Sequence, residues 1–272
     1  MHINFTRRLA QQAPLALLAA STLLAGCAAP GVAPEIVKTL APTGTLRIGV
    51  CPGSPTSLVR GPGADEMRGV TVDIGRELAR RPGVPVAYVV LERVPEVVEA
   101  LKSGRADFTN TNASPARAME IDFTPAVVGL ESGYLVPAGS SLRSVADVDR
   151  AGVRVGVTQG STSQGVLTRE LKQAQVVVAP SVIAVTQMLR DGGLESYATN
   201  KGILFEMSDK LPGSCVLEGR FGPERSAIGV PRGREAAAVW LKAFAADVVE
   251  QGLVQQAAAR AGLRGTVAPA KP

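Results

Sequence analysis

The sequence predicts an α/β protein with largely parallel sheets. Short apolar segments typical of strands alternate regularly with amphipathic segments of helical period, a pattern typical of parallel sheets covered by helices. Two further apolar segments, 133–136 and 227–230, are each followed by a proline and then by small polar or basic residues. Their pairing, taken together with a family resemblance described below, suggests two lobes, one of them discontinuous in sequence, joined by two crossing strands. Apolar residues make up 46% of the chain, enough to fill such cores.

The first 26 residues have the layout of a secretory signal peptide, with Arg7 and Arg8 before a short apolar run and small residues at its end. Cys27 follows directly, which resembles the lipobox of bacterial lipoproteins. That resemblance implies cleavage before Cys27 and a diacylglycerol (palmitate-type) anchor on its thiol. The alternatives are an ordinary signal peptide or a short transmembrane anchor, although the run is too short to span a bilayer comfortably. We expect a lipid-anchored protein on the periplasmic or extracytoplasmic face of a bacterial membrane.

The mature chain begins with a segment rich in Ala and Pro, 27–43, which predicts a flexible or partly extended linker. Alternation and β-branched content predict strands at 46–50, 84–91, 106–109, 153–157, 176–179 and 227–230. Helical spacing and end signals predict helices at 72–80, 94–102, 161–172, 182–189, 234–250 and 254–261, with Ser181 capping the fourth.

Removal of the first 26 residues changes the charge and the available chemistry. The segment holds two basic and no acidic residues, so 27 Lys and Arg remain against 24 Asp and Glu, and the net charge falls from +5 to +3. The charges are scattered and aromatic residues are few, so we expect no nucleic-acid partner. No second apolar stretch is long enough to cross a membrane. About 245 residues remain, which fits one large domain or two small ones.

His2 is the only histidine and leaves with the signal peptide. The mature protein therefore cannot use a Ser-His-Asp or Cys-His nucleophile, and it lacks the commonest ligand for zinc or copper. No metal-ligand spacing is visible, so we expect neither a metal nor a cofactor. Cys51 and Cys215 are the cysteines left after Cys27, and the sequence leaves open whether they pair or stay separate thiols.

The densest polar cluster between apolar anchors runs from Ala106 to Arg117 (ADFTNTNASPAR) and ends in the IDFT segment 121–124. Together with the segments 45–50, 69–74 and 155–162, in that order and spacing, it resembles the family 3 solute-binding proteins of bacterial ABC importers, the polar amino-acid type. The resemblance covers nearly the whole mature body.

The resemblance implies the type II periplasmic binding protein fold, with a ligand cleft between two lobes. Lobe 1 is then expected at 44–132 plus 231–268 and lobe 2 at 138–225. It also implies a receptor, expected to be a monomer, that closes around a small polar solute and presents it to the membrane subunits of an ABC permease.

Arg117 lies four residues before the IDFT segment, where the carboxylate-binding arginine of the family lies. Arginine suits that role because its planar fork binds a carboxylate through two hydrogen bonds. The alternative is a solvated surface arginine. The expected ligand-binding residues are Arg117, Asn110, Asn112, Ser114, Ser161, Thr162 and Asn200. For several of them the alternative role is to form a turn or cap a helix.

Two departures from the family pattern concern the ammonium group of an amino acid. Asn200 stands where amino-acid binders of the family place an acidic residue, and a neutral amide cannot offset the desolvation of an ammonium. The loop 51–54 lacks the acidic and aromatic residues common there. Glu195 lies near but is expected to face away. The sequence thus predicts a site that keeps the carboxylate half and loses much of the ammonium half.

The runner-up function is a periplasmic dehydratase-like enzyme for cyclic carboxylates on the same scaffold, since fold does not fix function. Such an enzyme needs a positioned general acid or base, and the sequence shows none near Arg117 or Asn200. Turnover of prephenate or arogenate by the purified protein would decide for it. A signalling or scaffolding lipoprotein is a third hypothesis.

Overall fold

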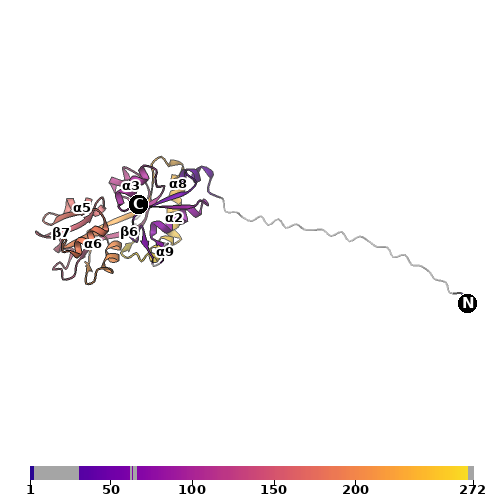
Figure 1. The fold of residues 1–272 in the computed structure, drawn as a ribbon. Helices are drawn as coiled ribbons and strands as arrows, with labels where there is room; N and C mark the ends of the chain where they lie inside the picture. Colours follow the sequence, from indigo (N-terminus) through magenta and orange to yellow (C-terminus); the bar gives the residue numbers. More distant parts are fainter. Residues whose placement is uncertain (3–30, 62, 64–65, 269–272) are drawn as a thin grey trace. The chain divides into compact units, whose positions relative to one another are not determined.

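One continuous mixed sheet runs from one lobe into the other (Figure 1). In this computed structural model, which describes residues 1–2, 31–61, 63 and 66–268, its strands lie in the order β5-β11-β6-β9-β7-β8. Their bounds are β5 Thr109–Asn112, β11 Gly222–Val230, β6 Asp122–Val136, β9 Ser196–Asn200, β7 Arg154–Thr158 and β8 Gln175–Ala179. Two short strands also pair with β6, namely β10 Cys215–Val216 and β12 Thr266–Val267.

Lobe 1 is built around β1 (Leu46–Val50) and its parallel partner β4 (Val86–Val90), with β5 reached through a bridge between Ile48 and Phe108. The remaining elements of this lobe are β2 Val59–Arg60, β3 Met67–Arg68, α2 Val70–Arg80, α3 Val94–Lys102, α4 Pro115–Ala118, α8 Glu235–Glu250 and α9 Leu253–Arg260. Ile48, Phe108 and Phe244 are each at most 1% exposed and belong to its core. Helices from both ends of the chain therefore cover one core.

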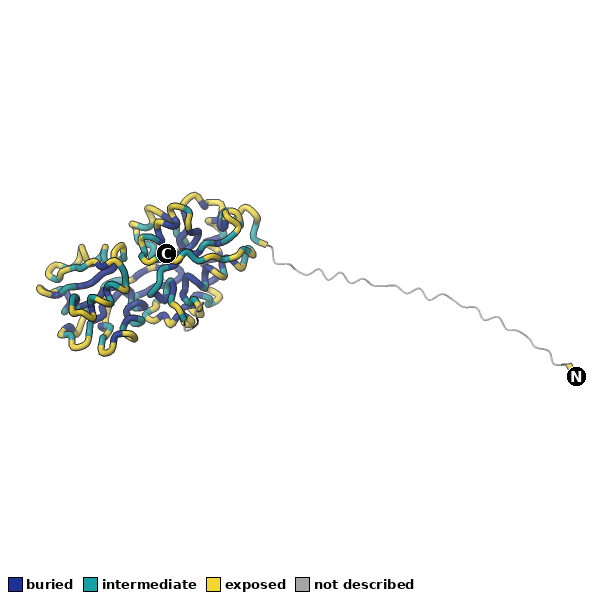
Figure 2. Tube along the Cα trace, in the orientation of Figure 1, coloured by how far each residue is buried: buried dark blue, intermediate teal, exposed yellow. Residues whose placement is uncertain are grey.

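Lobe 2 has a core on each face of its sheet. Figure 2 shows the buried stretches of its backbone inside the lobe, with exposed segments around them. Its parallel strands β7, β8 and β9 are covered by the helices α5 Thr162–Glu170, α6 Val182–Arg190 and α7 Lys201–Ser208, and the short 3-10 helix η1 spans Val145–Asp147. Successive residues of β6 point to opposite faces, so Tyr134 enters one core and Leu135 the other.

Two antiparallel strands, β6 and β11, connect the lobes, which confirms the two-lobed prediction. The crossing lies earlier in β6 and in β11 than the sequence suggested. Residues 133–135 already pair with β9 of lobe 2, and residues 227–229 pair with β5 of lobe 1. The connection is formed where 128–132 lies opposite 222–226. Pro137 and Pro231 follow the strand ends and do not mark the crossing.

Most predicted elements form within a few residues of their expected bounds. The prediction of largely parallel sheets is wrong for β5, β11 and β6, which are antiparallel to their neighbours. The strand expected at 106–109 forms at 109–112, and β9 and α7 were not predicted. The sequence of α7 is only weakly amphipathic. The helix begins at the residue directly after β9, so no glycine-, proline- or polar-rich loop separates the two elements in the sequence.

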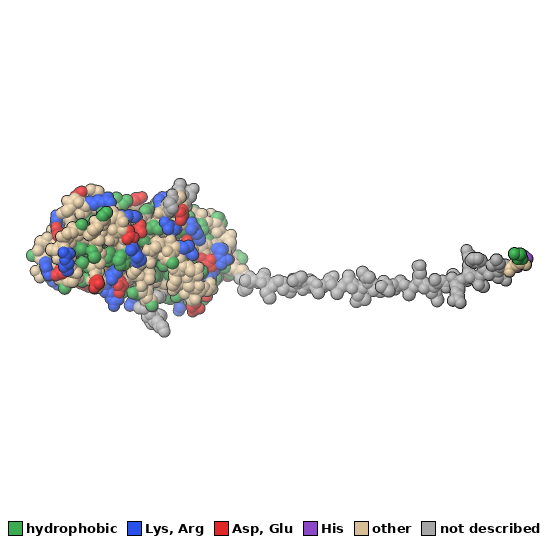
Figure 3. All heavy atoms as spheres, turned by 90° about the horizontal axis from the view of Figure 1, so that it is seen from below, with side chains coloured by type: hydrophobic (Ala, Val, Ile, Leu, Met, Phe, Trp, Pro, Cys, Tyr) green, Lys and Arg blue, Asp and Glu red, His purple; other side chains and the backbone are tan. Residues whose placement is uncertain are grey.

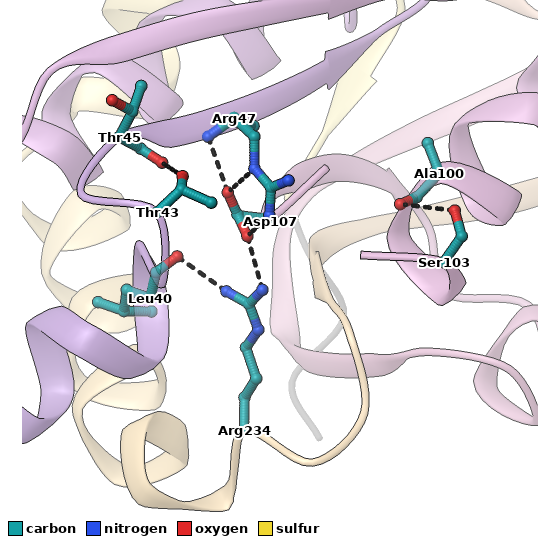
Figure 4. Close-up of polar contacts among 8 residues, drawn as sticks. All are labelled: Leu40, Thr43, Thr45, Arg47, Ala100, Ser103, Asp107 and Arg234. Atoms are coloured by element: carbon teal, nitrogen blue, oxygen red, sulfur yellow. Dashed lines mark hydrogen bonds and ion pairs between the residues drawn. The ribbon is translucent and has the colours of Figure 1, made fainter. Parts of the chain in front are cut away.

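The N-terminal linker prediction is wrong for part of its length. Pro34–Leu40 forms the helix α1, with proline in its first turn, where a missing N–H costs nothing. Leu40 is 2% exposed and Ala41 3%, and both lie with α1 against lobe 1. The backbone carbonyl of Leu40 accepts a hydrogen bond of 2.8 Å from Nη1 of Arg234 (Figure 4). Cys27 and the signal segment lie outside the described residues.

This packing predicts that a chain shortened to begin at residue 44 is less stable than one that begins at residue 32. Loss of the buried Leu40 side chain and of the acceptor for Arg234 should lower the free energy of unfolding by about 2–4 kcal/mol. Urea unfolding of the two chains followed by circular dichroism measures the difference. Equal midpoints would show that α1 contributes no stability.

A buried ion network holds the elements of lobe 1 together (Figure 4). Asp107 is 1% exposed and accepts hydrogen bonds from the backbone N–H of Arg47 at 3.0 Å and from its Nε and Nη2 at 2.8 Å. Nη2 of Arg234 donates to the same carboxylate at 2.6 Å. Burial by itself raises the pKa of Asp107, but the bonds from Arg47 and Arg234 outweigh it and hold that pKa below its usual range.

Charged side chains of both signs are interspersed on the surface seen in Figure 3. Among the described residues no helix is long and apolar enough to cross a membrane, and no three or more His, Cys, Asp or Glu side chains are grouped so that they could hold a metal ion. Cys51 and Cys215 are separate thiols.

Candidate functional site

A cavity of about 100 Å³ lies between the lobes. Lobe 1 contributes the loop after β1, the strand β5 and the short helix α4, and lobe 2 contributes the β7–α5 turn and the end of β9. The crossing strand β11 closes the cavity at its base. The polar residues among its lining are Cys51, Ser54, Thr56, Ser57, Thr109, Asn110, Thr111, Asn112, Arg117, Thr158, Ser161, Thr162, Tyr197, Thr199, Asn200, Glu224 and Ser226.

Arg117 lies where the lobes meet and binds both of them. Its Nη1 donates to Oγ1 of Thr111 at 2.9 Å and to the carbonyl of Asn112 at 3.2 Å, and its Nη2 donates to the carbonyl of Gly160 at 3.1 Å. All three acceptors are neutral. Desolvation lowers the pKa of Arg117, and the charge of Glu224 opposes that shift only in part. The guanidinium is thus a half-buried cation on the wall of the cavity, held by hydrogen bonds to both lobes.

Asn112 and Thr162 also join the lobes. Nδ2 of Asn112 donates to Oγ1 of Thr162 at 2.6 Å, and Oδ1 of Asn112 accepts from the backbone N–H of Arg225 at 2.8 Å. Both residues line the cavity, as expected of ligand residues. Their polar groups are nevertheless engaged with each other, so their contribution in this arrangement is to hold the lobes together.

The two predicted serines are helix caps. Oγ of Ser114 accepts from the backbone N–H of Arg117 at 3.4 Å and caps α4, and Oγ of Ser161 accepts from that of Gln164 at 3.1 Å and caps α5. Ser161 lines the cavity, whereas Ser114 lines only a neighbouring groove beside α5. The alternative of turn and cap chemistry therefore holds for both hydroxyls, and Ser114 is not brought to the cavity.

Asn110 is the predicted residue whose side chain is still available. It is 4% exposed and lines the cavity, and neither its Oδ1 nor its Nδ2 has a hydrogen-bond partner. Buried amides without partners are rare in folded proteins because each unpaired group costs free energy. An unpaired amide in a cavity wall is suited to a polar ligand.

Asn200 has a double role that leads to a residue the sequence did not reveal. Its Oδ1 accepts from the backbone N–H of Ile203 and caps α7, while its Nδ2 donates to Oε2 of Glu224 at 3.5 Å. Glu224 lies on β11, is 8% exposed and lines the cavity. Burial raises the pKa of Glu224, with Arg117 and Asn200 opposing the shift. The sequence showed no acid or base near Arg117 or Asn200, whereas the structure brings Glu224 to Asn200 and into the cavity lining.

No local signal could have pointed to Glu224. It stands in the sequence GPERSAIGV, where a charged residue beside an arginine before an apolar strand is typical of a solvated strand end. Only the pairing of β11 with β6 at Leu130 brings it to the crossing and so to the base of the cavity. Glu195, in contrast, pairs with Arg154 at 2.6 Å and does not line the cavity, as expected.

The sequence model of the family 3 bacterial extracellular solute-binding proteins matches residues 46–262. The chain belongs to this family. It is also similar to the glutamine-binding protein GlnH of an ABC transporter from Bacillus subtilis, with 24% identity over 184 residues, 66% of this chain and 67% of the relative.

Solved structures of other proteins have the same fold as this chain. The L-cysteine receptor of Neisseria gonorrhoeae matches with a TM-score of 0.73 and 22% identity, covering 83% of this chain and 92% of its own. An ancestral amino-acid-binding protein described as a precursor of cyclohexadienyl dehydratase matches with a TM-score of 0.72 and 19% identity, covering 82% and 97%. At these identities the structures establish the fold alone, which is the predicted two-lobed type II periplasmic binding protein fold.

The remaining lining of the cavity in this solute-binding protein carries hydroxyl and thiol groups and the apolar residues Pro52, Val94, Val97, Leu130, Val182 and Ile203. The hydroxyls of Tyr197 and Thr158 are 2.8 Å apart, and burial raises the pKa of Tyr197 to about 12. Burial, with a smaller effect from the charges of Glu92 and Glu96, also raises the pKa of Cys51 to about 12, so its thiol stays protonated. The loop after β1 contributes neither an acid nor an aromatic to the cavity, as the sequence indicates.

Proposed function

We propose that this protein is the substrate-binding subunit of an ABC importer and captures a small polar, carboxylate-bearing solute, an amino acid or a derivative of one. The observation that carries the proposal is the Arg117 guanidinium, which is half-buried, lines the cavity and has no carboxylate within 4.0 Å among the described residues. A partly desolvated cation of this kind is stabilised by an anionic ligand. The glutamine, cysteine and amino-acid binding named for its relatives supports the same class.

Capture works by hinge closure at β6 and β11, with the ligand favouring the closed arrangement. Arg117 suits this mechanism because it contacts Gly160 of lobe 2 while it belongs to lobe 1. A carboxylate bound to Arg117 therefore lies between the two lobes, where its hydrogen bonds can stabilise the closed arrangement. The lobe bounds expected from the sequence, 44–132 plus 231–268 and 138–225, are adjusted in this proposal: α1 and 227–230 join lobe 1, 133–137 join lobe 2, and 128–132 with 222–226 form the connection.

The proposal includes the lipid anchor on Cys27, which keeps the receptor beside the membrane subunits of its permease, and a monomeric state. It is supported by the lipobox-like sequence before Cys27 and by the family, whose members are extracellular. The segment between Cys27 and the start of α1 at Pro34 then serves as the tether.

The proposed role is transport without catalysis. Glu224 supplies the buried acid that the dehydratase hypothesis lacked, so that hypothesis can no longer be set aside on that ground. The family match and the transporter relatives favour transport, and the prephenate and arogenate assay distinguishes the two.

A thermal-shift screen over amino acids, organic acids and opines, followed by isothermal titration calorimetry of the hits, tests the proposal. We expect hits among carboxylates and little response to simple basic amino acids. Sugars and uncharged amides of the same size serve as controls. A response confined to solutes without a carboxylate would contradict the proposal.

A further inference from the structure

We infer that Glu224, on the crossing strand β11, is the anionic pole of the cavity and binds the ammonium group of an α-amino acid with a short, neutral side chain. This inference rests on the proposed function, since it presumes that Arg117 holds the carboxylate. It replaces the expectation that much of the ammonium half of the site is lost, and it assigns that half to Glu224 on β11 rather than to the Asn200 position on β9.

The first observation is the charge inventory of the cavity. Among the described residues that line the cavity, Arg117 is the one arginine and Glu224 is the one glutamate. None of these lining residues is a lysine, an aspartate or a histidine. Tyr197 and Cys51 also line it, but the pKa of each is about 12, so both are neutral near pH 7. One cation and one anion match a zwitterion. They leave no second acid for the side chain of lysine or arginine.

The second observation is the shortage of partners at Glu224. Its carboxylate can accept several hydrogen bonds but receives one, at 3.5 Å, from Asn200. It forms no ion pair within 4.0 Å with Arg117 or with another described residue. A buried carboxylate in this state costs free energy that a bound ammonium, with its charge and three donors, would offset.

Asn110 supplies the third observation. Its unpaired Oδ1 can accept from an ammonium, and its Nδ2 can donate to a ligand oxygen. The lining also includes serine and threonine hydroxyls, the thiol of Cys51, the ring of Tyr197 and the apolar residues Pro52, Val94, Val97, Leu130, Val182 and Ile203. A cavity of about 100 Å³ fits a side chain of a few atoms rather than a long one.

The experiment compares amino acids with their 2-hydroxy acid counterparts, which keep the carboxylate and replace the ammonium by a hydroxyl. L-alanine against L-lactate and L-serine against L-glycerate form the pairs, with L-cysteine, L-glutamine and L-arginine added. Titration calorimetry is performed on the wild type, on Glu224→Gln and on Glu131→Gln. Glu131 is the matched control, because it lies on the partner strand β6 and pairs with Lys201 and Arg220 outside the cavity.

We expect a short neutral amino acid to bind the wild type at least about 30-fold more tightly than its hydroxy acid. Glu224→Gln should lose about 30-fold or more of the amino-acid affinity and most of the preference for amino acid over hydroxy acid. Glu131→Gln should keep both. Because Glu224 is costly to ionise in its buried position, Glu224→Gln should also unfold at a temperature about 2–4 °C higher than the ligand-free wild type.

Equal binding of amino and hydroxy acids, or an unchanged preference in Glu224→Gln, would overturn the inference while leaving the carboxylate site intact. Tightest binding of L-arginine or L-glutamine would overturn the assignment to a short side chain. A higher unfolding temperature of Glu224→Gln shows that the variant is folded, so a loss of affinity cannot be attributed to misfolding. Absence of any carboxylate ligand would instead count against the proposed function itself.

Discussion

Replacement of Arg117 by alanine should lower the affinity for the carboxylate ligand by about 100-fold or more. The guanidinium is half-buried and bonded only to neutral oxygens, and the described residues of the cavity wall include no other cation that could neutralise a carboxylate. Loss of one partner of a desolvated charge pair commonly costs 2–5 kcal/mol or more. Titration calorimetry with the best hit of the solute screen measures the change.

Arg117→Lys should recover little of that affinity, because an ammonium is a point charge that cannot form two parallel bonds to a carboxylate. Arg105→Ala is a suitable control, since Arg105 is exposed on the turn before β5 and does not line the cavity. Circular dichroism should show that all three variants are folded. Unchanged affinity in Arg117→Ala would show that the carboxylate binds elsewhere.

Asp107→Asn should destabilise the protein by about 3–5 kcal/mol, the largest effect expected of a single substitution on folding. The variant leaves the guanidinium groups of Arg47 and Arg234 without their carboxylate, and Arg234 is only 9% exposed. Arg234 also anchors α1 through the carbonyl of Leu40, so the loss should extend to that helix. Urea unfolding at pH 7 gives the difference in free energy.

The effect of Asp107→Asn should depend on pH in a defined direction. The folded state holds the pKa of Asp107 below the value of about 3.9 expected in the unfolded chain. The carboxylate therefore contributes its full stability above about pH 4, and that contribution is lost as the pH falls through the lower folded-state pKa. The gap between wild type and variant should narrow in acid.

Glu99→Gln provides the comparison for Asp107. Glu99 pairs with Lys102 on the exposed side of α3, with more than half of its side chain exposed, and such pairs contribute about 0–1 kcal/mol. A loss in Asp107→Asn no larger than that in Glu99→Gln, or one that persists unchanged to low pH, would contradict the role given to the buried network.

The sequence predicted the elements whose signals are local. The alternation at 46–50 became β1, and Ser181 caps α6 as expected. The segment 27–43 was misjudged because Pro and Ala are common both in linkers and in a first helical turn, and nothing local shows that Leu40 is buried against lobe 1. The crossing was misplaced because proline marks the end of a strand and carries no information on which lobe the strand occupies.

In the candidate site, too, the features that follow from a short segment were predicted, and those that depend on contacts between distant residues were not. Arg117 was found because the motif around it is contiguous, so its place in the cavity follows from one short segment. The partners of Asn112 and Asn200 could not be predicted, since Thr162 and Glu224 are 50 and 24 residues away in sequence. Hydrogen bonds of that kind depend on how β5, β11 and the β7–α5 turn meet.

By itself, the sequence of this protein determined the two-lobed α/β fold, the family and the candidate residue Arg117, because hydrophobic period and contiguous motifs are properties of neighbouring residues. Only the tertiary structure decided where the strands cross, that α1 belongs to the folded body and that Glu224 lines the cavity. The physical reason is that burial and pairing depend on residues distant in the chain. Glu224 becomes a partly paired carboxylate in a cavity only when β11 lies beside β6 and Asn200 reaches it from lobe 2.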